Sequence, residues 1–378
     1  MRITFLTGSL EAGQDGVGDY TALLAGECGR LGAAVQVAAI ADRHLGSIAA
    51  SASGPLRLPH SMPWSTRLAL LERHVRDFDP DWVSVQFVPY SFHRWGIAVR
   101  ACEGLRRMTR RARLHVMLHE IWTAGNGSLR ERAVGAAQRW TLQRLCRRAS
   151  VVHTSNGTYQ HMVRTAGIDA ALLPLFGSVE VTEPAGRGWL ERACAEAGAP
   201  AIACERDQWW LAVMFGTLHP NWPPQPFIDR LRSAARESGK QVALISIGRL
   251  GPGEALWERM RASHGVTMPM VRFGEQSPAR ISELFQAADF GVATSPLTLL
   301  GKSATAAAMF EHGLPVIVNR NDGPRTPADP MDGADRELVI ELDDDFERRV
   351  RHASRRPPRR RLTATADRLL ADLSRVAA

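Results

Sequence analysis

Short apolar segments alternate with helix-like segments along this chain, and that alternation is the feature that most limits the folds open to it. The strand-like segments of the first half are residues 3–6, 34–40, 82–87, 114–118 and 150–153, and helical patterns cover 20–31 and 130–148. Strands that are apolar on both faces are typical of parallel sheets covered by helices on both sides. The sequence therefore predicts an α/β fold with a doubly wound parallel sheet.

A second series of the same kind follows an Ala-, Glu- and Gly-rich segment at 183–207. Its strand-like segments are 210–215, 241–247, 267–273, 290–293 and 315–318, and its helical patterns are 226–237, 279–287 and 303–312. Two such series predict two facing Rossmann-like doubly wound domains. We expect these domains at 1–178 and 209–355, joined by a linker at 179–208. The tail 356–378 contains an amphipathic helix pattern at 362–376.

The charge of the chain narrows the class of partner. Its 378 residues carry a net charge of +8, and the basic residues are almost all arginine, with lysine only at Lys240 and Lys302. The densest arginine runs, 106–113 and 355–361, lack the interleaved aromatic residues of nucleic-acid-binding surfaces, so we expect no nucleic-acid partner. The charge suits phosphorylated small molecules and leaves weak association with an anionic membrane face open.

The sequence shows no pattern of a spanning helix or a secretory signal, because its apolar runs are short and the first of them meets Gly8. The five cysteines are scattered without CxxC spacing, which is typical of reduced thiols in the cytoplasm. We therefore expect a cytoplasmic protein, with a peripheral position at the inner face of the membrane as a further option.

A glycine-rich turn at 13–18 follows the first predicted strand and opens a helix. Gly16 and Gly18 let the backbone approach a ligand, and amides at a helix N-terminus favour anions. The segment is not the dinucleotide fingerprint GxGxxG, since Thr21 stands where the third glycine belongs. A turn that simply needs small residues is the alternative interpretation.

Polar residues mark the ends of two other predicted strands in the first domain. Gln86 and Tyr90 lie at and after the strand 82–87, and His119 directly follows 114–118. Ligands of open α/β sheets bind beyond the carboxyl ends of the strands, so His119 is a candidate ligand-binding residue, with a structural histidine as the alternative. No HExxH or similar spacing surrounds it, and we expect no metal site.

In the second domain, Gly216 and Thr217 follow the first strand, and the segment 301–304 (Gly-Lys-Ser-Ala) opens a helix. Pro296 stands where the first glycine of a P-loop belongs, so this is not a Walker motif. Helix amides, a serine cap and the Lys302 ammonium nevertheless make a diphosphate-binding site plausible. The alternative is a serine-capped helix with an exposed lysine.

The order of three segments resembles the GT-B glycosyltransferases of the group-1, retaining type, which use nucleotide-activated sugars. The segments are 16–20 (Gly-Val-Gly-Asp-Tyr), 287–289 (Ala-Ala-Asp) and 313–317 (Gly-Leu-Pro-Val-Ile), so the resemblance spans most of the chain. It implies an acceptor-binding first domain, a donor-binding second domain and a final helix that returns to the first. It also implies an enzyme of carbohydrate biosynthesis, hexosyltransferase-like, that works without metal or cofactor.

Transferred residue by residue, the resemblance places His119 beside the transferred sugar and Lys302 at the leaving diphosphate. The resemblance also implies a UDP- or GDP-linked sugar as the donor, and a hydroxyl of a small-molecule, glycan or lipid-linked acceptor. The residues expected at the donor are Gly16, Gly18, Gly216, Thr217, Arg249, Gly301, Ser303 and Ala304. Those expected at the acceptor are Asp19, Tyr20, Gln86, Tyr90, Glu120 and Trp122.

The chain departs from the family pattern in the donor site. The family's Arg and Lys after the first strand of the second domain are Thr217 and Trp222 here, and Lys302, Arg249 and Arg320 are candidates to replace that positive charge. The family's two glutamates are replaced as well, by Leu and Ala at positions 300 and 308. Two alternatives therefore stay open: a binding protein of this fold that has lost transfer, and an NAD(P)-dependent oxidoreductase, which the missing third glycine disfavours.

Overall fold

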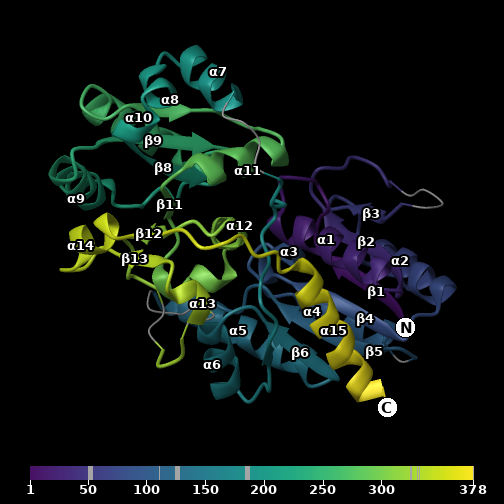
Figure 1. The fold of residues 1–378 in the computed structure, drawn as a ribbon. Helices are drawn as coiled ribbons and strands as arrows, with labels where there is room; N and C mark the ends of the chain where they lie inside the picture. Colours follow the sequence, from purple (N-terminus) through teal and green to yellow (C-terminus); the bar gives the residue numbers. More distant parts are fainter. Residues whose placement is uncertain are drawn as a thin grey trace. The chain divides into compact units, whose positions relative to one another are not determined.

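The computed structural model describes residues 1–49, 54–109, 111–123, 128–183, 188–323, 326–329, 331 and 333–377. The chain divides into two compact units (Figure 1). Unit 1 comprises Met1–Pro174, Thr326–Ala328 and Leu362–Ala378, and unit 2 comprises Leu175–Arg325 and Asp329–Arg361. Each unit is described by itself below.

Unit 1 is built on a seven-stranded parallel sheet in the order β3-β2-β1-β4-β5-β6-β7. Its strands are β1 (Arg2–Thr7), β2 (Ala34–Asp42), β3 (Leu56–Pro59), β4 (Trp82–Phe87), β5 (Arg113–Leu118), β6 (Val151–Thr154) and β7 (Ala171–Leu172). All six residues of β4 are buried, which agrees with a central strand that is covered on both faces.

The helices of unit 1 connect these strands, and the last one comes from the end of the chain. They are α1 (Gly16–Arg30), α2 (Trp64–Phe78), α3 (Pro89–Phe92), α4 (Val99–Met108), α5 (Leu129–Cys146), α6 (Gly157–Thr165) and α15 (Leu362–Ala377). Helix α15 packs against α1, with Leu369 and Leu373 fully buried, and the Thr363 hydroxyl donates a hydrogen bond to the Glu27 carboxylate. The expected amphipathic tail helix is therefore confirmed.

Unit 2 is built on a six-stranded parallel sheet in the order β10-β9-β8-β11-β12-β13. The strands are β8 (Trp209–Phe215), β9 (Gln241–Ile247), β10 (Met270–Arg272), β11 (Phe290–Ala293), β12 (Val316–Val318) and β13 (Val339–Glu341). The helices are α7 (Gly188–Glu196), α8 (Ala201–Cys204), α9 (Pro224–Glu237), α10 (Glu254–His264), α11 (Pro278–Ala287), α12 (Ala304–Glu311), α13 (Gly333–Arg336) and α14 (Phe346–Arg351). Short 3-10 turns lie at η1 (Arg206–Gln208), η2 (Gly251–Gly253) and η3 (Leu297–Lys302).

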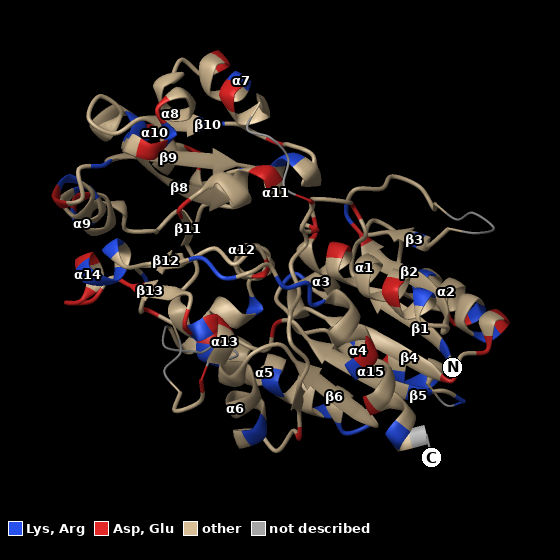
Figure 2. Ribbon diagram, in the orientation of Figure 1, with Lys and Arg blue, Asp and Glu red and all other residues tan. Residues whose placement is uncertain are grey.

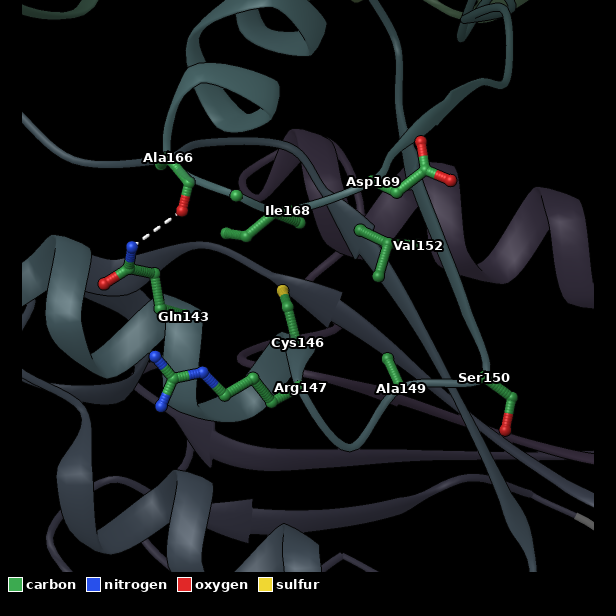
Figure 3. A pocket seen from close by; sticks show the side chains of 10 residues that line it. Gln143, Cys146, Arg147, Ala149, Ser150, Val152, Ala166, Ile168 and Asp169 are labelled. Carbon is green, nitrogen blue, oxygen red and sulfur yellow. Dashed lines mark hydrogen bonds between the residues drawn. The ribbon is translucent and has the colours of Figure 1, made fainter.

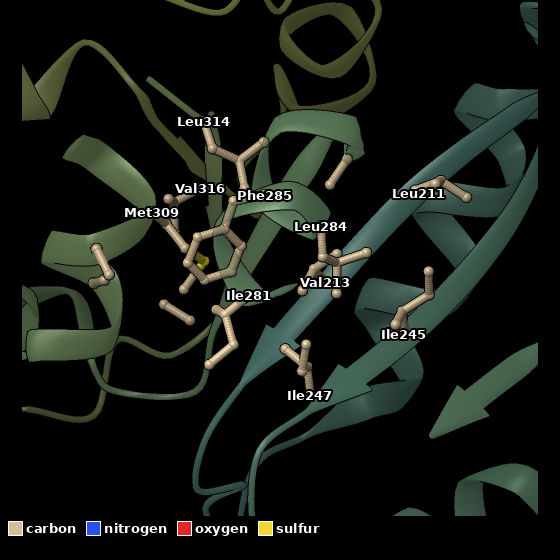
Figure 4. Close-up of a cluster of buried hydrophobic side chains, with 14 of the residues drawn as sticks. Leu211, Val213, Ile245, Ile247, Ile281, Leu284, Phe285, Met309, Leu314 and Val316 are labelled. Atoms are coloured by element: carbon tan, nitrogen blue, oxygen red, sulfur yellow. The ribbon is translucent and has the colours of Figure 1, made fainter. Parts of the chain in front are cut away.

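The core of unit 2 lies on both faces of its sheet. Successive strand residues point to opposite faces, and in β8 Leu211 and Val213 join one buried cluster, whereas Ala212 and Met214 join the other. Figure 4 shows part of the first cluster, in which Phe285 of α11 packs among aliphatic side chains. Burial of both faces explains why the strands are apolar runs without a polar alternation.

These observations confirm the predicted fold class of two doubly wound parallel sheets. The strand expected at 267–273 is shorter, because only Met270–Arg272 pairs with β9. Helix α5 begins where a capping box forms between Ser128 and Glu131, a known start signal for helices. In the part of the chain that the structure describes, no helix is long and apolar enough to cross a membrane.

Much of the positive charge is matched locally by acidic side chains. Ion pairs one helical turn apart include Arg30 with Glu27 at 2.6 Å and Arg261 with Glu258 at 2.7 Å. Figure 2 shows basic and acidic segments on the same helices, for example on α14. Exposed pairs of this kind contribute little to stability, but they break up the field that the net charge would otherwise produce.

Candidate functional site

The first group of predicted site residues lies at the carboxyl edge of the unit 1 sheet. Strands β1, β4, β5 and β6 are neighbours and parallel, so their carboxyl ends meet at one edge. His119 follows β5 directly and is 8% exposed. Its backbone N–H donates to the Phe87 carbonyl of β4 at 3.1 Å, which fixes the start of the loop after β5.

His119, Gln86 and Tyr20 form one buried cluster at this edge. His119 Nε2 lies 2.9 Å from Gln86 Oε1, and the Tyr20 ring meets the imidazole edge to face, with 4.7 Å between the ring centres. Burial raises the pKa of the Tyr20 phenol above its ordinary value, so Tyr20 stays neutral. The fold therefore brings together three residues that the sequence analysis placed beside sugar and acceptor.

The glycine-rich turn is held by its own carboxylates. Asp15 caps α1 and accepts hydrogen bonds from the amides of Val17 at 3.0 Å and Gly18 at 2.9 Å, and Asp19 accepts from the Gly13 amide at 3.0 Å. A Cβ on Gly18 would lie 2.5 Å from the Ser9 carbonyl oxygen, so this glycine is needed for close packing. A phosphate at the Val17 and Gly18 amides would have to displace the Asp15 carboxylate.

The other predicted acceptor residues follow the same strands, Tyr90 in the short helix α3 after β4 and Glu120 and Trp122 in the loop after β5. The Tyr90 hydroxyl accepts a hydrogen bond from Gln138 Nε2 at 3.2 Å. The Arg139 guanidinium lies 5.5 Å from the ring centre of Trp122, a cation–π distance. Glu120 is half-buried next to His119, and its backbone N–H points to Phe87 O at 3.4 Å.

Unit 2 has a cavity of about 270 Å³ at the carboxyl ends of β8 and β11. Its polar and glycine lining consists of Gly216, Thr217, His219, Thr294, Ser295 and Thr305. Gly216 has φ +73° and Gly248 has φ +90°, and a Cβ on Gly248 would lie 3.2 Å from the Gly216 backbone. The two turns after β8 and β9 therefore require glycine to approach each other.

The start of α12 reaches this cavity through Thr305. Ser303 caps the helix by accepting a hydrogen bond from the Ala306 amide at 3.3 Å, and the Ser303 and Thr305 hydroxyl oxygens lie 2.9 Å apart. Gly301 and Lys302 end η3 just before the cap, and Ala304 is the first residue of the helix. The predicted diphosphate-binding segment 301–304 thus directly precedes the cavity residue Thr305 in the sequence. Its Ser303 hydroxyl also forms a hydrogen bond with the Thr305 hydroxyl.

Two of the candidate cations differ in how they relate to the cavity. Arg249 follows β9 and pairs with Glu275 at 2.6 Å. Arg320 has a side chain only 9% exposed, donates to the Thr294 carbonyl at 3.1 Å and pairs with Asp322. Burial and then the Arg320 charge lower the pKa of His219, so the cavity wall combines a neutral imidazole with a nearby guanidinium.

Three of the four positions where the family carries charged residues are packed into the core here, whereas Thr217 is exposed and lines the cavity. Trp222 is 2% exposed and packs against Phe227, with 5.4 Å between their ring centres. Leu300 and Ala308 are also buried, and a Cβ on Gly177 would lie 2.5 Å from the Ala308 Cα atom. Close packing against Ala308 therefore requires glycine at 177.

A larger cavity of about 360 Å³ lies at the opposite edge of the unit 1 sheet (Figure 3). It is lined by the end of α5 and by residues just before β6 and after α6, including Cys146, Ser150 and Ile168. Gln143 Nε2 donates to the Ala166 carbonyl at 2.7 Å across its rim. Since ligands of such sheets bind at the carboxyl edge, we place the candidate site elsewhere.

Four residues that line the cavity were not among those predicted at the donor: His219, Thr294, Ser295 and Thr305. The available signal was their position directly after the strands 210–215 and 290–293 and at the start of the helix 303–312. Among the described residues, no three His, Cys, Asp or Glu side chains gather as ligands for a metal ion.

Comparison with known proteins places this architecture among solved structures. The sequence matches no protein-family model and no curated protein. The chain is similar to the HepE protein of Anabaena in complex with UDP and glucose, with a TM-score of 0.57, 15% identity and coverage of 99% of this chain and 95% of HepE. The chain has a GT-B-like fold.

Two further solved structures share this fold. A glycosyltransferase from Rickettsia africae has a TM-score of 0.59 at 11% identity, with coverage of 100% of this chain and 98% of that one. A putative UDP-N-acetylglucosamine 2-epimerase from Listeria monocytogenes has a TM-score of 0.55 at 11% identity, with 99% and 95% covered. At these identities the similarity concerns the fold, and function depends on the site.

Proposed function

We propose that this protein transfers a sugar from a nucleotide diphosphate sugar to an acceptor hydroxyl. The observation that supports this best is the cavity at the carboxyl ends of β8 and β11, where glycine turns, hydroxyl groups and the start of α12 converge. Backbone amides and hydroxyls at such an edge suit a phosphorylated ligand. The similar HepE structure contains UDP, which favours a UDP-linked donor here.

In this proposal unit 2 binds the donor. Lys302 directly precedes the Ser303 cap, and the Arg320 guanidinium donates to the Thr294 carbonyl. These two side chains supply the positive charge that the family obtains from the residues replaced by Thr217 and Trp222. Positive groups and helix amides stabilise the charge that develops on the departing diphosphate. The residues thus fit a reaction without a metal ion.

In the same proposal unit 1 supplies His119 and the acceptor site. The acceptor oxygen forms a bond to the anomeric carbon while the bond from that carbon to the diphosphate oxygen breaks. The acceptor proton passes to the departing diphosphate, which becomes a stronger base as its charge develops. His119 contacts the transferred sugar or the acceptor, and Tyr20 and Gln86 hold its ring.

The test is to incubate the pure protein with a panel of UDP- and GDP-sugars and candidate acceptors, and to search for the product by mass spectrometry. Titration calorimetry with UDP and GDP measures nucleotide binding separately. We expect UDP to bind and one UDP-sugar to be consumed. Failure of both nucleotides to bind would exclude the proposal.

A second candidate is a binding protein of the same fold that has lost transfer. The observation that favours it is the replacement of the family's charged residues by the buried Trp222, Leu300 and Ala308. This candidate predicts nucleotide binding in the calorimeter with no turnover of any activated sugar. The two measurements described above therefore separate the two candidates.

Replacement of Lys302 tests the assignment of positive charge to the donor site. We expect Lys302→Ala to weaken UDP binding about tenfold, because a charge-assisted hydrogen bond to a phosphate is lost. The matched control is Lys240→Ala, which removes the other lysine of the chain from the loop after α9, where it donates to the Asp207 carbonyl. Equal UDP affinities of the two variants would show that Lys302 does not contact the diphosphate.

A further inference from the structure

A chain of buried side-chain hydrogen bonds runs from His119 through three strands of unit 1 to the last helix. Its members are Gln86 and Ser84 of β4, His115 of β5, His153 of β6 and Asp372 of α15. Ser84 and His115 are register partners in the adjacent strands β4 and β5, which brings their side chains together on one face of the sheet.

Every link of this chain has hydrogen-bond length. Gln86 Nε2 lies 2.9 Å from Ser84 Oγ, and Ser84 Oγ lies 2.8 Å from His115 Nδ1. His115 Nε2 lies 3.0 Å from His153 Nδ1, and His153 Nε2 lies 3.1 Å from Asp372 Oδ2. With the 2.9 Å contact from His119 Nε2 to Gln86 Oε1, five links join His119 to the carboxylate.

The Asp372 carboxylate determines which atom donates and which accepts in each of these hydrogen bonds. An ionised carboxylate only accepts hydrogen bonds, so His153 must carry its proton on Nε2. A neutral imidazole has one donor and one acceptor nitrogen, so His153 Nδ1 accepts from His115 Nε2, and His115 Nδ1 accepts from the Ser84 hydroxyl. Ser84 then accepts from the Gln86 amide, whose oxygen accepts the Nε2 proton of His119.

If every hydrogen bond ran in the opposite direction, two acceptor nitrogens would face each other. If the Gln86 amide were flipped, Ser84 would donate to it, and His115 would have to donate from Nδ1 to Ser84. His115 Nε2 would then be an acceptor 3.0 Å from the acceptor Nδ1 of His153. Only a charged imidazole relieves that contact, and burial opposes it.

Burial keeps the two central histidines neutral. His115 and His153 have no exposed surface, and burial lowers the pKa of His115 well below its ordinary value. Burial also lowers the pKa of His153, although Asp372 acts in the other direction. The side chain of Asp372 is only 12% exposed and is paired with Arg375 and Arg368.

We propose that Asp372 of the C-terminal helix is a positioning residue that holds His119 in the Nε2–H tautomer through this chain. In that tautomer Nε2–H is committed to Gln86, and Nδ1 is the acceptor nitrogen that a hydroxyl group of a sugar or acceptor can meet. The role in transfer rests on the proposed function. The assignment of the histidine tautomers does not depend on the proposed function.

The tautomers are measured directly by long-range ¹H–¹⁵N correlation spectra of protein labelled with ¹⁵N-histidine. Difference spectra with His119→Ala, His115→Gln and His153→Gln assign the three rings among the 12 histidines of the chain. We expect all three rings as neutral Nε2–H forms at pH 7.5. An Nδ1–H or doubly protonated form at any of them would overturn the proposal.

With Asp372→Asn the direction of donation along these hydrogen bonds is no longer determined, because an amide donates as well as accepts. We expect an Nδ1–H population at His153 and His119 and about a tenfold lower kcat, comparable to the loss when a supporting partner of a site histidine is removed. The KM for the donor should stay within twofold. The matched control is Asp367→Asn, the same change at an exposed site of α15, with tautomers and kcat as in the wild type.

Ser84→Ala cuts the chain without touching α15 and serves if Asp372→Asn does not fold. It should release His119 into both tautomers while His153 keeps its proton on Nε2. Unchanged tautomers at His119 in this variant, or in Asp372→Asn, would overturn the proposal. If the tautomers shift as expected but no sugar is ever transferred, the proposed function fails and the positioning role of Asp372 stands.

Discussion

Replacement of His119 by alanine is expected to lower kcat/KM for sugar transfer about 100-fold, while the affinity for UDP stays within twofold. The imidazole is buried at the carboxyl edge of unit 1, and a polar contact made there in the transition state is worth a few kcal/mol when water is excluded. The nucleotide is assigned to unit 2, so its binding should be unaffected. Calorimetry with UDP and initial rates with the active UDP-sugar measure the two effects.

The control for this prediction is His161→Ala, which removes a half-exposed histidine of α6 from the same unit. This variant should transfer sugar at the wild-type rate. A parallel loss of UDP affinity in His119→Ala would place the histidine at the nucleotide. An unchanged rate would remove it from the transfer site.

The second large effect concerns Glu311 at the end of α12. Its side chain is almost completely buried (4% exposed), and burial raises its pKa to about 7, although the Gly177 amide donates to it at 3.0 Å. The folded protein then holds a proton that the unfolded chain releases near its ordinary value of 4.5. Stability must therefore fall as the pH rises from about 4.5 to about 7, by about 3 kcal/mol in total.

Glu311→Gln should remove this pH dependence, since the amide stays neutral and its oxygen still accepts from Gly177. We expect the variant and the wild type to differ in unfolding free energy by about 2 to 3 kcal/mol more at pH 8 than at pH 5, with the variant favoured at the higher pH. Urea unfolding at both pH values measures this. Glu337→Gln, at a side chain that is 74% exposed, should keep the wild-type dependence, and a Glu311→Gln curve parallel to the wild type would contradict the prediction.

The sheets were the part of the fold that the sequence predicted best. Strands such as β8 and β9 are largely buried on both faces, so they appear as mostly apolar runs bounded by polar segments. Some helices with one exposed face were not predicted from the sequence. In α4 the buried residues Ala101, Cys102 and Leu105 follow a helical spacing, but arginines at its end dominate the composition.

The candidate site was predictable to the extent that it depends on strand ends. His119 was placed at the carboxyl edge because it directly follows a strand. Its contacts with Gln86 and Tyr20 depend on the order of strands in the sheet, which local patterns do not determine. The hydrogen-bond chain to Asp372 also depends on the register of β4 with β5 and on where the final helix packs.

The packing of α15 on α1 has a consequence for how the protein is made. Unit 1 begins at the first residue but is completed by the last helix, Leu362–Ala377, so synthesis of all of unit 2 intervenes. Until α15 has been synthesised, the apolar surface that covers Leu369 and Leu373 is exposed and His153 lacks its carboxylate partner. Domains generally fold as units from the N-terminus while they are synthesised. Here unit 1 must wait for the synthesis of Leu362–Ala377, and nascent chains stalled before this segment would expose an aggregation-prone face.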